Sequence, residues 1–548
     1  MREHFDRIAA SPGRSIALLV LLSGVFFIGL GHVHLFDWDE INFAESAREM
    51  IASGDHLKVQ INYLPFWEKP PLFFWLQVMS MRVFGINEFA ARLPNALFGV
   101  LYLLTFYSIG RRHLTARFGL LWALMFFGTI LPHLYFKSGI IDPVFNYFIL
   151  MSVYHVMLAL GPTGLARHAL VAGLFSGLSV LTKGPVGLLL VGLTAFVFLL
   201  LQRFRGFPGV RKIVLFISGF ILVIAGWLVA ELNQNGTGNL LRFVAYMVDL
   251  FTTGVAGHEQ PFHYHFVVVL LGYFPISVLA MPYLWGGGAE DDPLRFRRWM
   301  QVLFWVVMIV FSVTTTKIVH YSSMAYAPLS FLAALFVYRL DEHRERMRRY
   351  QRWMLPALGL LWSTLFLLIP LVMLNRERVI PYIKDPFAAE GMRAALPWTG
   401  AEAIVGLVHL ALVLWALHRF RKRLYLAGIL LFVASTVITL LLVLFVFLPK
   451  IESATQGPAI RFYERIAAED AYVETYGYKS YAQYYYARLP YEASTERTNM
   501  DWLLKGPIDK PVYLVTKVTE TGLEAYPDIR LLGIEGGFKF HKRDPGGK

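Results

Sequence analysis

The chain has 548 residues, of which 56% are hydrophobic and 16% are charged, with a mean hydropathy of +0.51 and a formal net charge of +13. A soluble globular chain carries about 25% charged residues and fewer apolar ones, so this composition predicts a polytopic membrane protein. The absence of cysteine excludes disulfides, thiolate metal sites and cysteine nucleophiles.

The first apolar run, residues 15–34, is too long for a signal-peptide core and lacks a small-residue cleavage site, so we expect it to be retained as a membrane span. Similar runs recur along the chain. Stretches long enough to cross roughly 30 Å of hydrocarbon predict about thirteen spans, near residues 15–35, 88–110, 115–136, 140–160, 167–182, 184–202, 213–232, 264–286, 299–316, 320–338, 353–375, 401–418 and 424–448.

The basic residues of the connections predict the orientation. Arginine-rich connections fall on alternate turns, on the side of the N-terminus, at residues 111–117, 202–212, 294–298, 339–352 and 418–423. The positive-inside rule makes that side cytoplasmic. The positive charge therefore reflects topology, and no nucleic-acid partner is expected, because no basic patch interleaved with aromatics occurs in a soluble segment.

An odd number of spans places residues 449–548 on the opposite face from the N-terminus. Strand-like runs at 471–477 and 510–517, separated by glycine and proline, predict a small α/β domain there. The predicted organisation is thus a membrane domain, residues 1–448, followed by an outer domain, residues 449–548, that shows no site of its own.

Acidic residues crowd the first outer loop, residues 36–87, directly after the first span. Its opening stretch, FDWDEINFAESAREM, has apolar residues at helical spacing, which predicts an amphipathic interfacial helix with its acids facing water or a cavity. A structural alternative makes Asp37 and Glu40 a capping box and Glu45 and Arg48 a surface pair. That alternative does not account for Asp39, which we therefore assign to a substrate.

A second stretch of this loop, LPFWEKPPLFFW, places Glu68 and Lys69 before two prolines that suit the first turn of a helix, followed by an apolar run too short to span. Further outer turns contribute His133, Lys137, Asp142, Lys183, Lys317, His320 and Tyr321. Any single lysine at a span end could simply reach to lipid headgroups. Together these residues predict a pocket for a phosphate and a hydroxylated or amino sugar.

The stretches DEINFAESAREM and PFWEKPPLFFW, the Asp142 turn, LTKGPVGL and KIVHY…AYAPLSFLAAL resemble the bacterial branch of the protein O-mannosyltransferase superfamily, in particular the ArnT-like 4-amino-4-deoxy-L-arabinose transferases, over the whole chain. The resemblance implies a GT-C glycosyltransferase with about thirteen spans, two interfacial helices in the first outer loop and a C-terminal periplasmic domain. It implies a bacterial inner-membrane enzyme that transfers a sugar, with inversion, from a polyprenyl (undecaprenyl) phosphate carrier to a periplasmic acceptor. In the arabinose branch that acceptor is a lipid A phosphate.

Two departures from the family pattern concern the substrates. Asn42 and Phe43 stand where the family usually has arginine and tyrosine, and the third outer loop has no arginine after Arg242. Three alternatives follow: a different sugar, a different glycan or protein acceptor, or phosphate binding moved onto Lys69, Lys183 and Lys317.

The expected chemistry assigns roles to these residues. Asp39 would position or deprotonate the acceptor, and Glu68 would hold the sugar. Lysines can neutralise the leaving phosphate, so no cofactor is required, although Glu68 and His320 could hold a divalent metal such as Zn or Mg. The substrate-binding set comprises Glu40, Lys69, Lys137, Asp142, Lys183, Lys317, His320 and Tyr321. A lipid-linked sugar flippase is the competing class, but the nearly charge-free centres of the spans favour an enzyme.

Overall fold

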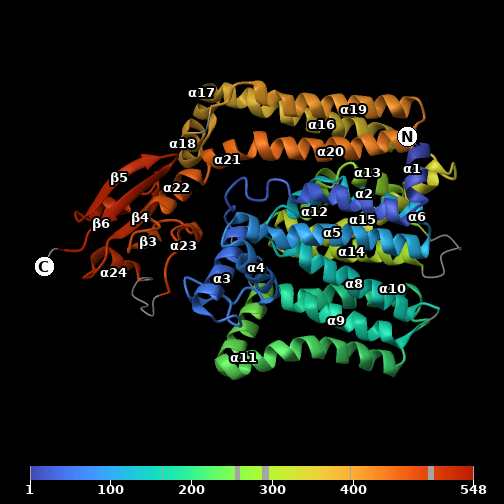
Figure 1. The fold of residues 1–548 in the computed structure, drawn as a ribbon, viewed down its shortest axis with the longest axis horizontal. Helices are drawn as coiled ribbons and strands as arrows, with labels where there is room; N and C mark the ends of the chain where they lie inside the picture. Colours follow the sequence, from blue (N-terminus) through green and yellow to red (C-terminus); the bar gives the residue numbers. More distant parts are fainter. Residues whose placement is uncertain are drawn as a thin grey trace.

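The computed structural model describes residues 2–162, 164–252, 260–286, 295–394, 397–491 and 499–546. Figure 1 shows a slab of long helices with a small sheet-containing unit at one end. The helices of the slab are α1 (Arg2–Ala9), α2 (Pro12–Ser23), α5 (Glu88–His113), α6 (Ala116–Phe127), α7 (Ile130–Tyr135), α8 (Asp142–Leu160), α9 (Ala166–Lys183), α10 (Val186–Leu201), α11 (Val210–Thr252), α12 (Tyr264–Gly272), α13 (Ile276–Ala280), α14 (Phe296–Val313), α15 (Tyr326–Asp341), α16 (Arg349–Leu374), α19 (Ile404–Arg421) and α20 (Tyr425–Val446).

The described helices agree with a multi-pass membrane protein. Eight helical segments are long and apolar enough to cross a membrane, and ten if each of two sharply bent pairs, α1 with α2 and α12 with α13, counts as one span. Helices α6 and α10 are apolar but shorter. Each of the predicted spans contains a helix, whereas the total of about thirteen stays a prediction.

Neighbouring helices approach closely where both carry small residues. A Cβ on Gly110 of α5 would lie 2.5 Å from the Cα of Gly119 in α6, so no larger residue fits there. This is the usual way in which helices pack in a membrane, where lipid provides no hydrophobic force between them.

Helix α11 is broken at Gly236, whose φ of 71° and ψ of −177° are not helical. Glycine adopts a positive φ without the steric cost of a side chain. The second arm of α11 therefore turns away from the slab and runs toward the first outer loop, as Figure 1 shows beside α4.

The first outer loop holds α3 (Asp39–Ser53), a short hairpin of β1 (Gln60–Ile61) and β2 (Leu64–Pro65), and α4 (Leu72–Phe84). Every residue of α3 from Glu40 to Met50 is buried. The prediction that the acids of this helix face water or a cavity is therefore wrong for Glu40, Glu45 and Glu49. The reason is that α4, the hairpin and the C-terminal unit all pack around α3.

The structural alternative for this loop is also corrected. The N-cap of α3 is Trp38, without a side-chain cap, while Asp37 accepts a hydrogen bond from Ser480. Glu45 and Arg48 do pair, at 2.7 Å, but their side chains are only 0% and 6% exposed, so the pair is internal and not at the surface.

Residues after α20 form the unit at the end of the slab. Helices α21 (Leu448–Ala454) and α22 (Gly457–Ile466) lead into a sheet ordered β3-β4-β6-β5, which α23 (Ala482–Tyr486) and α24 (Met500–Lys505) accompany. Strands β3 (Tyr472–Thr475) and β4 (Val512–Lys517) are parallel, whereas β5 (Ile529–Glu535) and β6 (Phe538–Arg543) complete the sheet in antiparallel pairs. The two predicted strand runs correspond to β3 and β4.

Candidate active site

A histidine bridges two carboxylates that come from different helices. His320 lies in η3 (Val319–Ala325), between α14 and α15, and its Nε2 is 3.6 Å from Oδ2 of Asp39 and 3.8 Å from Oδ2 of Asp142. Both acids are the first residues of their helices, α3 and α8, where the helix dipole favours negative charge. The Asp39 side chain is 36% exposed and that of Asp142 only 5%, so Asp39 is the more accessible carboxylate.

Lys183 completes this group. It is the last residue of α9, and its Nζ donates a hydrogen bond to Oδ1 of Asp142 at 2.7 Å. The ammonium also lies 5.2 Å from the ring centre of Tyr321. Four of the residues predicted for substrate binding, Asp142, Lys183, His320 and Tyr321, thus converge beside Asp39, and we call these five residues the central group.

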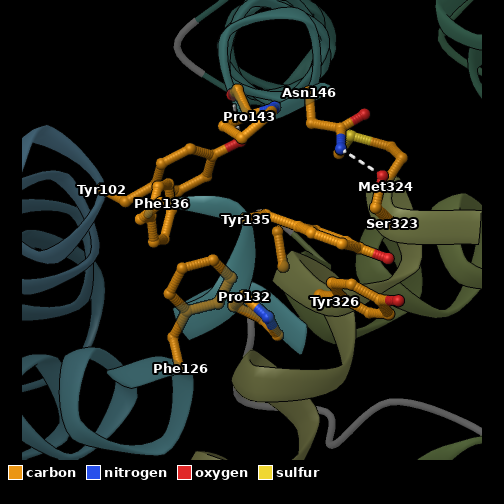
Figure 2. A pocket seen from close by; sticks show the side chains of 11 residues that line it. Tyr102, Phe126, Pro132, Tyr135, Phe136, Pro143, Asn146, Ser323, Met324 and Tyr326 are labelled. Atoms are coloured by element: carbon orange, nitrogen blue, oxygen red, sulfur yellow. Dashed lines mark hydrogen bonds between the residues drawn. The ribbon is translucent and has the colours of Figure 1, made fainter. Parts of the chain in front are cut away.

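Helix α8 fixes the backbone of His320 through two hydrogen bonds. Asn146 donates to Oγ of Ser323 at 2.8 Å, and that hydroxyl donates to the carbonyl oxygen of His320 at 2.5 Å. Figure 2 shows the first of these bonds at the edge of a small pocket walled by aromatic rings. With about 20 Å³ the pocket is far below the roughly 300 Å³ or more that ligand sites occupy, so it supports the site and does not hold a sugar.

Glu68 and Lys69 approach the central group from the segment before α4. Oε2 of Glu68 lies 3.5 Å from Nζ of Lys69, and Lys69 interacts electrostatically with both Asp142 and His320. Tyr246, on the second arm of α11, is hydrogen-bonded to Glu68, and burial together with the Glu68 charge raises the pKa of its phenol. The outer loop and the broken helix α11 therefore meet at the same site.

Glu40 has a different environment. Its carboxylate pairs with Arg92 of α5 at 2.9 Å and accepts backbone hydrogen bonds from Phe36 and Gly139. Burial alone would raise the pKa of Glu40, but the Arg92 guanidinium and these hydrogen bonds outweigh it and hold the pKa below its usual value. The contacts favour a structural role for Glu40, because both of its oxygens are already occupied.

Two lysines predicted for substrate binding are engaged with the backbone. Lys137 donates to the carbonyl oxygens of Val25 and Ile28 at 2.6 and 2.5 Å. Lys317 donates to those of Gln260 and Thr314 at 2.9 and 2.5 Å and is 6% exposed. A role for either lysine in substrate binding stays a prediction.

The predicted metal site also stays a prediction. Within the part of the chain that the structure describes, no group of three or more His, Cys, Asp or Glu residues could hold a metal ion. His320 faces Asp39 and Asp142, and Glu68 faces Lys69 and Tyr246. A Zn or Mg ion at Glu68 and His320 would therefore need further ligands from a substrate or from water.

Sequence reasoning missed a contribution from the C-terminal unit. Ser480 donates to Oδ2 of Asp37 at 2.5 Å, and the ring of Tyr481 meets that of Trp38 edge-on at 5.5 Å between centroids. Although Asp37 is exposed as a residue, the protein around its carboxyl desolvates it and, with the nearby charge of Asp39, raises its pKa to about 6, against the effect of the Ser480 bond. The one signal in the sequence is the density of tyrosine between residues 476 and 486.

Comparisons with known proteins place this chain beside membrane sugar transferases in sequence. The model of the family described as dolichyl-phosphate-mannose-protein mannosyltransferase matches residues 68–229. The undecaprenyl phosphate-alpha-4-amino-4-deoxy-L-arabinose arabinosyl transferase of Pectobacterium carotovorum is 27% identical over 77% of this chain and 75% of its own length. The transferase of the same name from Edwardsiella ictaluri is 26% identical over 64% of this chain and 65% of its own.

The fold has a close counterpart among solved structures. The crystal structure of ArnT from Cupriavidus metallidurans bound to undecaprenyl phosphate matches with a TM-score of 0.78, covering 97% of this chain and 98% of that one at 19% sequence identity. Its apo form matches with a TM-score of 0.76.

The fold defines the architecture of this protein: it is a multi-pass membrane protein with the fold of ArnT. Its sequence is similar to the arabinosyl transferases named above, which agrees with the resemblance seen in the sequence.

Proposed function

We propose that the protein transfers a sugar from a polyprenyl phosphate carrier to an acceptor at the outer face of the membrane, with inversion at the anomeric carbon. The observation that carries this proposal is the central group, in which the partly exposed Asp39 carboxylate lies beside a buried Asp–Lys–His arrangement at the ends of several helices. Relatives whose names specify undecaprenyl phosphate and an arabinosyl transfer support the same reading.

The leaving group needs positive charge. When the bond between the anomeric carbon and the phosphate oxygen breaks, the phosphate keeps the electron pair, and Lys69 and Lys183 would supply the positive charge at the site. Asp142 would hold Lys183 in place for this contact, and the isoprenoid chain would stay among the apolar spans.

The acceptor oxygen attacks the anomeric carbon from the side opposite the leaving phosphate. If it is a hydroxyl, its proton passes to the Asp39 carboxylate, which His320 orients; if it is a phosphate oxygen, Asp39 orients the acceptor and no proton moves. A single carboxylate on the acceptor side suffices for direct displacement.

For the finer substrates we propose 4-amino-4-deoxy-L-arabinose as the sugar and a lipid A phosphate as the acceptor, with the site facing the periplasm. The test is mass spectrometry of lipid A and of surface glycans from cells with and without the gene. The expected result is loss of one aminopentose from a lipid A phosphate when the gene is deleted. An unchanged lipid A with an altered glycan or protein would reject this acceptor and keep the transferase.

A flippase would behave differently from a transferase. Purified protein given a polyprenyl phosphate sugar and acceptor should release free polyprenyl phosphate together with a glycosylated product. Movement of the intact lipid-linked sugar across the bilayer of a proteoliposome, without release of carrier, would reject the enzyme.

A further inference from the structure

Trp38 is a large aromatic side chain exposed next to the reaction site. It immediately precedes Asp39 and is 43% exposed. Because it lies outside the apolar spans, lipid tails do not account for its exposure. An indole ring combines a broad apolar face with one polar edge, so an exposed ring at a site for carbohydrates offers a surface on which a sugar ring can stack.

The indole is held in one orientation. With the Asn42 amide turned so that its oxygen faces the ring, that oxygen accepts from Nε1 of Trp38 at 3.1 Å, and the amide nitrogen donates to the Trp38 carbonyl at 3.0 Å. Asn42 itself is only 1% exposed. The ring of Tyr481, from the C-terminal unit, packs nearly perpendicular to the indole.

This arrangement explains the departure at position 42. An amide supplies a donor and an acceptor, whereas a guanidinium only donates. The arginine that the family usually carries there could not accept the indole N–H, so Asn42 and an anchored Trp38 depend on each other. The change removes one positive charge near the reaction site.

Lys479 places a positive charge beside the indole. Its Nζ lies 5.2 Å from the ring centres of both Trp38 and Tyr481. The side chain is exposed, and no carboxylate pairs with it among the described residues. An ammonium over an aromatic face is attracted by the ring, which keeps the lysine beside the indole while its charge stays available.

The surface formed by Trp38, Lys479 and Tyr481, here called the rim, lies beside the loop that carries Asp39. Trp38 directly precedes Asp39 in the chain. Tyr481 interacts electrostatically with Tyr246, which is hydrogen-bonded to Glu68. The bond from Ser480 to Asp37 fixes the C-terminal segment against the outer loop. A molecule on the rim would therefore lie next to the segment that carries Asp39.

We propose that the rim is an acceptor subsite for a phosphorylated sugar, whose ring stacks on Trp38 and whose phosphate pairs with Lys479. This inference rests on the proposed transferase function and names the part of the acceptor that the chain recognises. A charge-assisted contact between lysine and phosphate is the strong element of the subsite, and the indole supplies the apolar one.

The test measures acceptor binding without any donor present. Full-length purified protein is titrated with glucosamine 1-phosphate, with unphosphorylated glucosamine, and with lipid A in nanodiscs. Lys479→Gln should weaken binding of the two phosphorylated probes by about ten- to a hundredfold and leave glucosamine unaffected. Trp38→Ala should weaken all three. If only lipid A shows the effect, the occupant is the glycolipid; if both phosphorylated probes show it, the phosphosugar alone suffices.

Lys505→Gln is the matched control, since Lys505 is an exposed lysine of the same unit whose Nζ lies over Tyr526 at 5.7 Å. It should bind every probe as the parent does. Equal binding by Lys479→Gln and Lys505→Gln, or no binding of either phosphorylated probe by the parent, would overturn the subsite.

Binding of polyprenyl phosphate separates the acceptor subsite proposed here from the proposed use of a polyprenyl phosphate donor. Lys479→Gln and Trp38→Ala should bind the carrier as tightly as the parent, which also shows that both variants are folded. Should Trp38→Ala fail to fold, Trp38→Phe, which keeps an aromatic face, should retain most sugar binding. A parent that binds phosphosugar but not carrier would reject the proposed donor and leave the rim intact.

Discussion

At the scale of single residues, two acids of one loop differ through their surroundings. Asp39 is 36% exposed and faces His320, whereas Asp37 is held by Ser480 and carries a raised pKa of about 6. Both residues are aspartates of the same loop. Their different surroundings therefore decide which of the two can act on a substrate.

The first prediction is that Asp39→Asn abolishes transfer while the protein stays folded. The change keeps the shape and removes the charge that orients the acceptor; for a hydroxyl acceptor it also removes the group that takes the proton. Acid–base and positioning groups contribute roughly a hundredfold or more. Transfer of labelled sugar by purified protein should fall by at least that factor, with carrier binding retained. Asp37→Asn is the control and should be mild, because an amide oxygen still accepts from Ser480. Retention of more than about a tenth of the activity in Asp39→Asn would contradict the role.

The second prediction concerns pH and Asp37. Its carboxyl titrates near its ordinary value of 3.8 in the unfolded chain but near 6 in the folded protein. Between these values the unfolded chain releases its proton first, so the free energy of unfolding should decrease as pH rises from about 4 to about 6 and stay lower above. In detergent, the Tm of the parent should fall relative to that of Asp37→Asn across this window. Parallel Tm profiles of the two proteins would show that Asp37 does not titrate in this way.

At the scale of elements, α3 shows which structural features can be predicted from the sequence and which cannot. The helical spacing predicts the helix itself, and short motifs at helix ends identify Asp39, Asp142 and Lys183, because each motif is local. The burial of α3 depends on partners far away in the chain. Arg92 is 52 residues from Glu40 and Ser480 is 443 residues from Asp37, and no local pattern indicates such pairs.

The third prediction tests the pair that anchors α3. Arg92 binds Glu40 and donates to the carbonyl oxygens of Leu30, Val33 and His34 at 2.7 to 2.8 Å. Its loss leaves a buried carboxylate uncompensated, which costs about 3–5 kcal/mol. Arg92→Leu should therefore lower the Tm strongly in a thermal unfolding assay. Arg82→Leu, at an exposed position of α4, is the control and should change it little. The same Tm for both variants would show that the buried pair is not needed.

At the scale of the whole molecule, the site is built from both parts of the chain. His34 pairs with Glu452, the backbone of Leu35 donates to Tyr486 at 2.7 Å, and Asp37 accepts from Ser480. These contacts lie in the short segment between the first span and α3. The C-terminal unit therefore fixes the loop that carries Asp39, and it must lie on the same face of the membrane as that loop, whatever the total number of spans.

The last prediction is the side on which this face lies. The arginine-rich connections predict that residues 202–212 are cytoplasmic, so residues 449–548 should be periplasmic. Because the chain has no cysteine, single cysteines report the side directly. In spheroplasts, a membrane-impermeant maleimide should label Lys505→Cys at once, and Arg205→Cys only after permeabilisation, since both positions are exposed in the structure. Alkaline phosphatase fused after Pro449 should be active in the same cells. Labelling of Arg205→Cys in sealed spheroplasts, with Lys505→Cys protected, would invert the topology and place the reaction site in the cytoplasm.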